Sequence, residues 1–431
     1  MHRNIKPYFI LIFLLTSLLA TGQKMINSPY SRFGPGVIER QGILKSRAMG
    51  GAGIALRDPV SINYLNPASY SSIDTNSFVF DFGIEYQLNI LDNNNETYQS
   101  DDINFHHLAL AIPINKWMGF ATGIFPYSNG YYNIIKTVTE NDTEFDPLIG
   151  EYQNTHKGSG SYNTYFAGIG LSPIRNLSIG VNFTYLFGYI ERDNLYLFTG
   201  DNNQFNNLSS ENIRLYGYNF DYGIQYTVNL KNDFFASAGF TYSMKKRYNS
   251  EYENLFTRYA PFQSSEYSFD TLNYVFDKNS SVDLPRKIGM GIAFGKKDFF
   301  MVTADYTMTE WDRVSFHGYE EYLVNSSSFN LGAELIPDKN ANFNYLNRIE
   351  YRLGGFFSNS QLVVNGEQLN EFGITFGAGL PMNRSNSKVN LFVEYLKRSG
   401  SLDNDLHDEN CLTVGVSLNL YDYWFVKQKY K

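Results

Sequence analysis

Residues 412–420 read Leu-Thr-Val-Gly-Val-Ser-Leu-Asn-Leu, and this stretch decides the fold class. Leucines and valines occupy every second position, from Leu412 to Leu420, and the positions between them hold Thr, Gly, Ser and Asn. Because successive side chains of a β-strand point to opposite faces, the stretch predicts a strand with one apolar face and one small or polar face.

The same alternation recurs from residue 76 to the end of the chain. We expect about fourteen antiparallel strands. They lie roughly at 76–91, 104–115, 117–136, 159–173, 177–193, 212–230, 233–249, 282–295, 298–315, 327–336, 348–358, 371–382, 387–398 and 411–425. The fold class is therefore all-β. A water-soluble sandwich would show a similar alternation, so the connections must separate a sandwich from a barrel.

The connections between these strands alternate between long and short. Long polar connections are expected at 92–103, 137–158, 194–211, 250–281, 316–326, 359–370 and 399–410, and short ones such as 230–233 fall between them; 337–347 is longer than a tight turn. Long outer loops, short periplasmic turns and an even strand number are typical of bacterial outer-membrane barrels. We therefore predict a transmembrane antiparallel β-barrel with both ends of the barrel in the periplasm.

Composition excludes other classes of protein. The chain has 431 residues, 43% of them hydrophobic and 17% aromatic, with a mean hydropathy of -0.32. No apolar run after residue 20 reaches the about 20 residues of a spanning helix. The net charge of -8 argues against nucleic-acid binding. A single cysteine, Cys411, excludes a disulfide framework.

The amino terminus predicts export. Arg3 and Lys6 precede an apolar stretch at residues 9–20, and Ala20-Thr21-Gly22 forms a small-x-small cleavage site. We divide the chain into a signal peptide at 1–22, an amino-terminal segment at 23–75 and the barrel at 76–431.

Charged residues fall on the small or polar face of several predicted strands. They are Asp81, Glu85, Asp221, Glu350, Arg352 and Glu394. A lipid-facing Arg or Lys at the middle of a bilayer costs roughly 2–4 kcal/mol, so these charges are expected to point into the lumen. We expect them to pair with one another there; contact with a translocating solute is the alternative. Trp117, Trp311 and Trp424 fit the aromatic girdles of the membrane interface.

The segment at 23–75 does not alternate, yet it is too apolar for a free tail. It contains Gly50, Gly51 and Gly53, and then Asn66, Pro67 and Ala68. Because a barrel of about fourteen strands leaves a lumen that needs filling, we expect this segment to plug it.

These residues resemble a known family. The Gly-Gly-x-Gly run with Ala55, Asp58 and Asn66-Pro67-Ala68 is similar to the amino-terminal hatch of the long-chain fatty-acid transporter family, and the related barrel of protein secretion in Bacteroidetes has a similar segment. Leu284-Pro285 opening a strand, with the later Trp311, agrees. The resemblance implies a fourteen-stranded barrel, a hatch, and passage of hydrophobic molecules across the outer membrane.

The third predicted strand contains Phe-Pro-Tyr-Ser-Asn-Gly-Tyr at residues 125–131. Pro126 cannot donate to a strand ladder, and Gly130 in a strand often marks a bulge or bend, so we expect a break that includes Asn129. The family resemblance implies a sideways opening of the wall here. A local bulge without an opening is the alternative.

Chemistry that would indicate an enzyme, a cofactor or a metal is missing from the sequence. His106 and His107 are adjacent in a predicted strand, so their side chains are expected on opposite faces. The acidic loop at 403–409 could offer oxygen ligands to Ca²⁺, but it lacks the spacing of an EF-hand. We predict no enzymatic activity, no cofactor and no metal site.

Two hypotheses of function remain. The leading one is a passive, hatch-gated channel for hydrophobic small molecules such as fatty acids, with lateral exit at the third strand. The alternative is a non-transporting accessory barrel in an outer-membrane protein secretion or assembly complex, because Tyr- and Asn-rich loops suit protein recognition. The expected partners are outer-membrane lipid, a hydrophobic small molecule, or other outer-membrane or secretion proteins. A pore for polar solutes is weaker, because the hatch should block it.

Overall fold

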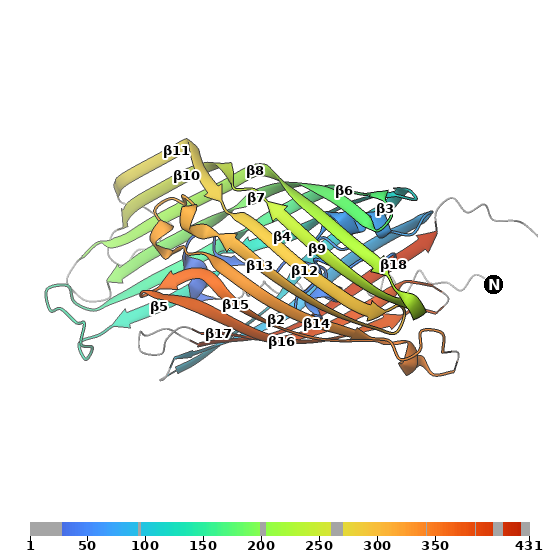
Figure 1. Cartoon of the computed structure of the whole chain (residues 1–431). Coiled ribbons are helices and arrows are strands. Elements are labelled where there is room, and N and C mark those ends of the chain that lie inside the picture. The colour runs from blue at the N-terminus through green and yellow to red at the C-terminus, as the bar shows by residue number, and fades with distance from the viewer. Residues whose placement is uncertain are drawn as a thin grey trace, which may run out of the picture.

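The computed structural model describes residues 28–93, 96–198, 204–259, 270–341, 343–383, 385–399 and 408–423, which form one antiparallel barrel (Figure 1). The predicted signal peptide, Trp424 and all of the acidic loop at 403–409 except its last two residues lie outside these ranges. No helix among the described residues has the length and apolarity to cross a bilayer.

The barrel wall has fourteen strands, as predicted. They are β2 (Ser77–Asn93), β3 (Glu96–Asn115), β4 (Met118–Asn129) with β5 (Tyr132–Val138), β6 (Tyr152–Ile174), β7 (Leu177–Phe198), β8 (Asn206–Asn229), β9 (Phe234–Ser243) with β10 (Lys246–Tyr259), β11 (Asp270–Leu284) with β12 (Arg286–Lys296), β13 (Phe300–Glu310), β14 (Ser326–Leu335), β15 (Glu350–Val364), β16 (Glu367–Pro381), β17 (Lys388–Ser399) and β18 (Asp408–Tyr423). The last strand closes the barrel on the first, with Tyr423 opposite Ser77 and Asp408 opposite Asp92.

The alternation of residues 412–420 separates the outside of the wall from the inside. Leu412, Val414 and Val416 are about 40% exposed, whereas Thr413 and Ser417 are at most 3% exposed. The apolar face thus points outward, around a polar interior. This is the reverse of a soluble sandwich and is expected of a barrel that meets lipid.

Several strands extend beyond the predicted ends. The long connections expected at 92–103, 194–211 and 250–281 consist largely of paired strand, because β2, β3, β7, β8, β10 and β11 continue past the apolar belt. The predictions for these connections are wrong since the extensions are polar and so resemble loops. Short turns such as η3 (Lys231–Asp233) connect the strands at the other end.

The amino-terminal segment from Ser28 to residue 75 lies inside the wall. It contains η1 (Pro29–Arg32), β1 (Val37–Ile38), α2 (Leu44–Arg47) and η2 (Pro67–Ser72). Leu44, Met49, Ala68 and Tyr70 are fully buried against wall residues. We call residues 28–75 the hatch segment.

Candidate functional site

Wall glycines seat the hatch segment directly on the barrel backbone. Asn66 caps η2 by accepting from the Ala68 amide at 3.1 Å, and its Nδ2 donates to the Ile54 carbonyl at 2.8 Å. A Cβ at Gly180 would lie 2.3 Å from the Pro67 carbonyl carbon, and one at Gly223 would lie 2.0 Å from the Asn66 Oδ1. The Asn66-Pro67-Ala68 motif therefore lies where the wall has no side chains.

The glycine run of the hatch segment makes a second close contact. Gly50 has a φ of +68° and its N–H donates to Thr375 Oγ1 at 2.9 Å. The Gly53 and Ile54 amides both donate to Asp305 Oδ2, at 2.6 and 2.8 Å. Since a carboxylate that accepts two backbone amides is a strong, charge-assisted contact, Asp305 fixes this turn on the wall.

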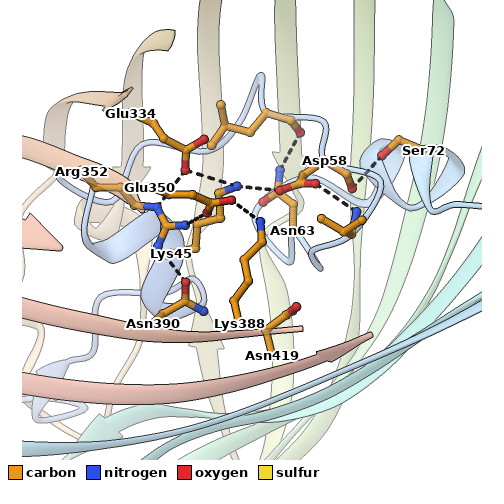
Figure 2. Close-up of polar contacts among 12 residues, drawn as sticks. Lys45, Asp58, Asn63, Ser72, Glu334, Glu350, Arg352, Lys388, Asn390 and Asn419 are labelled. Carbon is orange, nitrogen blue, oxygen red and sulfur yellow. Dashed lines mark hydrogen bonds and ion pairs between the residues drawn. The ribbon is translucent and has the colours of Figure 1, made fainter. Parts of the chain in front are cut away.

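Six charged residues join the hatch segment to the wall near the short-turn end, and Figure 2 shows them. We call them the turn-end network: Lys45, Asp58, Glu334, Glu350, Arg352 and Lys388. Lys45 Nζ lies 2.6 Å from Asp58 Oδ2 and 3.4 Å from Glu334 Oε2. Arg352 pairs with both Glu334 and Glu350, and Lys388 also pairs with Glu350. The network faces a cavity of about 590 Å³ between the hatch segment and the short turns.

A second group of charges lies deeper in the lumen. We call it the central network: Arg40, Arg47, Glu85 and Glu394. Arg40 and Arg47 donate to the two oxygens of Glu394 at 2.8 and 2.9 Å, and Arg47 approaches Glu85 at 4.0 Å. Arg40 also stacks on Phe356, with its guanidinium carbon 3.2 Å from the ring centroid. Both hatch cations of the central network, Arg40 and Arg47, are thus held by wall carboxylates.

An apolar cluster lies in the lumen at the long-loop end. We call it the mouth cluster: Tyr30, Tyr162, Leu186, Ile190, Ile213, Leu215, Tyr248, Val282, Leu284, Trp311, Val314, Phe316, Leu323, Leu362 and Leu369. It joins hatch residue Tyr30 to the strands and to the loop with η4 (Trp311–Arg313) and η5 (Glu320–Tyr322). Phe316 and Leu369 are fully buried. The interface-girdle prediction for Trp311 is wrong, because its ring is 3% exposed within this cluster.

The wall separates between β3 and β4. The β3–β4 ladder ends at Leu108 opposite Ile124, and β4 then pairs with β1, Val37 opposite Asn129. The Glu39 amide donates to the Tyr127 carbonyl at 2.9 Å, and Gln41 Nε2 donates to the Pro126 carbonyl at 3.1 Å. The hatch segment therefore forms hydrogen bonds to the part of β4 that β3 does not pair with.

The third wall strand is interrupted between β4 and β5 at Gly130 and Tyr131. The Gly130 amide donates to the Gly160 carbonyl, and the ladder to β6 shifts register between Pro126 and Ser128. The ladder to β6 nevertheless continues on both sides of the break. Pro126, Asn129 and Gly130 thus lie at the irregular point of the wall, on the side next to the separation.

His106 and His107 are not on opposite faces, so that prediction is wrong. A register shift between β2 and β3 at Gly83 and Ile84 turns both rings inward, where they are at most 3% exposed. Their Nδ1 atoms are 2.7 Å apart, and His107 Nε2 lies 2.8 Å from Asp81 Oδ1. A β-bulge places two consecutive residues on one face, and a strict period of two cannot show it.

The structure places the predicted lumen charges inside the barrel but does not pair them only with one another. Glu85 and Glu394 meet Arg47, Glu350 meets Arg352 and Lys388, and Asp81 meets His107. Asp221 accepts from Ser243 and, with Lys287, lines a separate cavity of about 160 Å³.

Sequence reasoning missed the basic partners. They are Arg40, Lys45 and Arg47 of the hatch segment, with Lys388 and Arg398 of the wall. The sequence signal that could have indicated these partners is the excess of basic residues in the hatch segment. A plug inside an acidic lumen explains this excess. Within the described ranges no group of three or more His, Cys, Asp and Glu is arranged to hold a metal ion.

Fold and site together define an outer-membrane type of β-barrel that carries its own amino-terminal segment inside. The chain belongs to the BamG family, whose model matches residues 3–431. No curated protein matches the sequence.

The structure is similar to several solved barrels. The monoaromatic hydrocarbon channel CymD matches with a TM-score of 0.57 at 14% identity, covering 92% of this chain and 99% of that one. A Pseudomonas aeruginosa FadL homologue matches at 0.55 and 12%, covering 89% and 98%, and the Ralstonia pickettii toluene transporter TbuX at 0.53 and 15%, covering 91% and 99%. The resemblance to fatty-acid-transporter-like barrels is thereby confirmed for the fold.

Proposed function

We propose that this protein is a sealed outer-membrane barrel that serves as a non-transporting accessory subunit of an outer-membrane protein secretion or assembly complex. The observation that carries the proposal is that the hatch segment is joined to the wall at three levels. The mouth cluster, the central network and the turn-end network each join the hatch segment to the wall. Membership of the BamG family, rather than of a family named for transport, supports the same choice.

The energetics of the two networks favour a fixed plug. Arg47 and Glu394 have side chains no more than 5% exposed, and Arg352 is fully buried. Separating a buried ion pair leaves uncompensated charge, and removing one partner typically costs about 3–5 kcal/mol. A hydrophobic solute gives these charges no replacement partner. Displacing the hatch for each passage would therefore be costly.

The second candidate is the channel for hydrophobic small molecules, and one observation favours it. Beside the separation of β3 and β4, Tyr64 stacks on Phe125 with centroids 4.6 Å apart, and Phe166 lies 4.7 Å from Tyr64. These rings would offer an apolar path to a lateral exit. The fold shared with CymD and TbuX supports this route, and fatty acids are the substrate class that we would test first.

Location and processing belong to the same proposal. We infer export by a signal peptide at 1–22, a hatch at 23–75, a barrel at 76–431, and both barrel ends in the periplasm. The exposed apolar belt of the wall supports insertion in the outer membrane, because such a belt needs lipid around it. Labelling of intact cells would test the orientation: reagents outside the cell should reach the loop at residues 139–150 and not the turn at 231–233.

One comparison of purified material separates the candidates. The intact protein is extracted from outer membranes in mild detergent, and co-purifying proteins are quantified beside uptake of a long-chain fatty acid by the same cells. The accessory role predicts stoichiometric partner proteins and uptake unchanged by deletion of the gene. Loss of uptake on deletion, with no partner protein, would refute the accessory role in favour of the channel.

A further inference from the structure

Strand β11 leaves one of its edges open outside the barrel. We propose that the free edge of β11, from Asn273 to Asp277, receives an extended segment of another polypeptide as an added β-strand. The proposal rests on the accessory role and names the chemistry by which the partner would be recognised: backbone hydrogen bonds, with apolar and basic side chains.

The edge belongs to a ribbon that projects from the wall at the long-loop end (Figure 1). In it β10 pairs with β8 on one side and with β11 on the other. Across the described residues, the register pairs β11 with β10 alone. β12 has 11 residues, which is enough to cross the hydrocarbon layer of a bilayer, so residues 270–281 stand beyond that layer.

The side chains of this edge are exposed although several are large and apolar. Leu272, Tyr274 and Phe276 are 39%, 55% and 53% exposed, and the alternation of the regular stretch 273–277 puts Tyr274 and Phe276 on one face. Val275, on the opposite face, is 43% exposed. Natural proteins protect open edges with lysine, proline or bulges that turn the edge away. Residues 270–281 contain one lysine, Lys278, and no proline, but the register to β10 shifts at Leu272 and again at 278–279, so the regular part of the edge is 273–277.

The occupant that fits this edge is a polypeptide strand. A row of free backbone N–H and C=O groups is satisfied along its length by another extended backbone, and alternate side chains of the added strand then meet the edge residues. A lipid chain would cover Tyr274 and Phe276 but leave the backbone groups unsatisfied. The edge therefore selects a protein segment with apolar residues at alternate positions.

Charge distinguishes between two possible occupants of the edge, a segment of another protein and a second copy of this chain. The outer part of the ribbon, at 251–259 and 270–278, carries four acidic residues, Glu251, Glu253, Asp270 and Asp277, and two basic ones, Arg258 and Lys278. Glu251 pairs with Arg214 of β8 at 3.7 Å, whereas Glu253 and Asp277 form no salt bridge among the described residues. Two copies would bring two negative ribbons together, whereas a basic strand would neutralise them.

Site-specific photo-crosslinking in intact membranes tests the proposal. A benzophenone amino acid replaces Tyr274 or Phe276, one position at a time, and mass spectrometry identifies each cross-linked residue. Strand addition predicts one segment of one other protein, with the cross-linked residue moving by two for each two-residue step of the probe. Cross-links to this same chain, cross-links without register, or none at all would overturn the proposal.

A pair of variants tests the same edge by affinity. Tyr274→Lys combined with Phe276→Lys places charges of the protective kind on the edge, and should lower the amount of partner retained in purification about tenfold. Leu148→Lys is the control, because Leu148 is 86% exposed in another loop at the same end. Full retention in the double variant overturns the strand proposal and leaves the accessory role intact. If wild-type protein retains no partner, the accessory role itself fails.

Discussion

At the scale of single residues, the contact between Gly50 and the wall decides how closely the hatch approaches the barrel. A Cβ at Gly50 would lie 2.5 Å from the Gly355 carbonyl oxygen and would sit on a residue with positive φ. We expect Gly50→Ala to lower the free energy of unfolding by about 2–5 kcal/mol, as the sum of overpacking and left-handed strain. Urea unfolding monitored by the gel-mobility shift of the barrel measures this change.

Gly318 supplies the matched control for that experiment. It has a φ of +84°, and nothing lies within 4 Å of its hypothetical Cβ. Gly318→Ala therefore reports the backbone strain alone, about 1–2 kcal/mol. Equal losses for the two variants would show that the hatch does not press on the wall at Gly50.

Asp58 gives the turn-end network a defined response to acid. Burial alone would raise the pKa of Asp58, but the Lys45 and Lys388 ammonium groups outweigh it and hold the pKa below the ordinary aspartate value. A carboxylate with a lowered folded-state pKa stabilises the fold fully above its unfolded pKa, and that contribution is lost as the pH falls further. The network should therefore hold throughout the neutral and mildly acidic range.

Hydrogen exchange across α2 measures this response. Protection of Leu44–Arg47, corrected for intrinsic exchange, should be unchanged from pH 7 to pH 5 and fall only below about pH 4, near the unfolded pKa of aspartate. Asp58→Asn should reduce protection at neutral pH and remove the acid step. An acid step that persists in Asp58→Asn would assign it to another carboxylate.

At the scale of elements, β1 and the residue that follows it, Glu39, substitute for the missing neighbour of β4, and their hydrogen bonds can be removed singly. Glu39→Pro deletes the N–H that donates to Tyr127 and leaves that carbonyl without its partner, at a cost of about 1–3 kcal/mol. We expect amide exchange of residues 125–129 to rise by roughly 5- to 150-fold, the equivalent of that cost. Glu39→Gln keeps both the N–H and a side-chain oxygen for Asn129 Nδ2, so it should change exchange little. Unchanged exchange in the proline variant would show that β1 does not hold β4.

Some elements of the structure can be predicted from the sequence and others cannot. The wall was predictable, because the lipid requires one apolar face on each strand, as residues 412–420 illustrate. The hatch could be expected to fill the lumen, but its partners could not be named, since a segment without periodicity has no register that sets Lys45 beside Glu334 or Arg47 beside Glu394. The bulge at His106 and His107 and the burial of Trp311 escaped prediction because each depends on a neighbouring segment, not on the strand's own pattern.

At the scale of the whole molecule, the proposed sealing of the barrel by the hatch segment can be measured electrically. If the three sets of hatch–wall contacts block the lumen as we propose, wild-type protein in a planar bilayer should show no steady conductance. Deletion of residues 28–75 removes every hatch contact, including Tyr30 of the mouth cluster, and should open a water-filled path past the remaining wall and loop residues of that cluster, because a barrel of fourteen strands is too wide for its own side chains to fill. We expect steady, ohmic channels from the deletion variant.

The conductance experiment needs a control for folding, since the deletion also removes packing from the wall. The gel-mobility shift of the intact barrel must be retained, and Arg47→Ala with Glu394→Ala supplies a second variant in which the hatch is loosened but present. This variant removes a buried pair but leaves Arg40 and Glu85 without their ionic partners, so the same mobility shift must show that it folds. We expect this variant to show brief openings, with a mean conductance between that of the wild type and that of the deletion variant. Wild-type conductance as large as that of a folded deletion variant would refute the sealed barrel, and with it the physical basis for a non-transporting role.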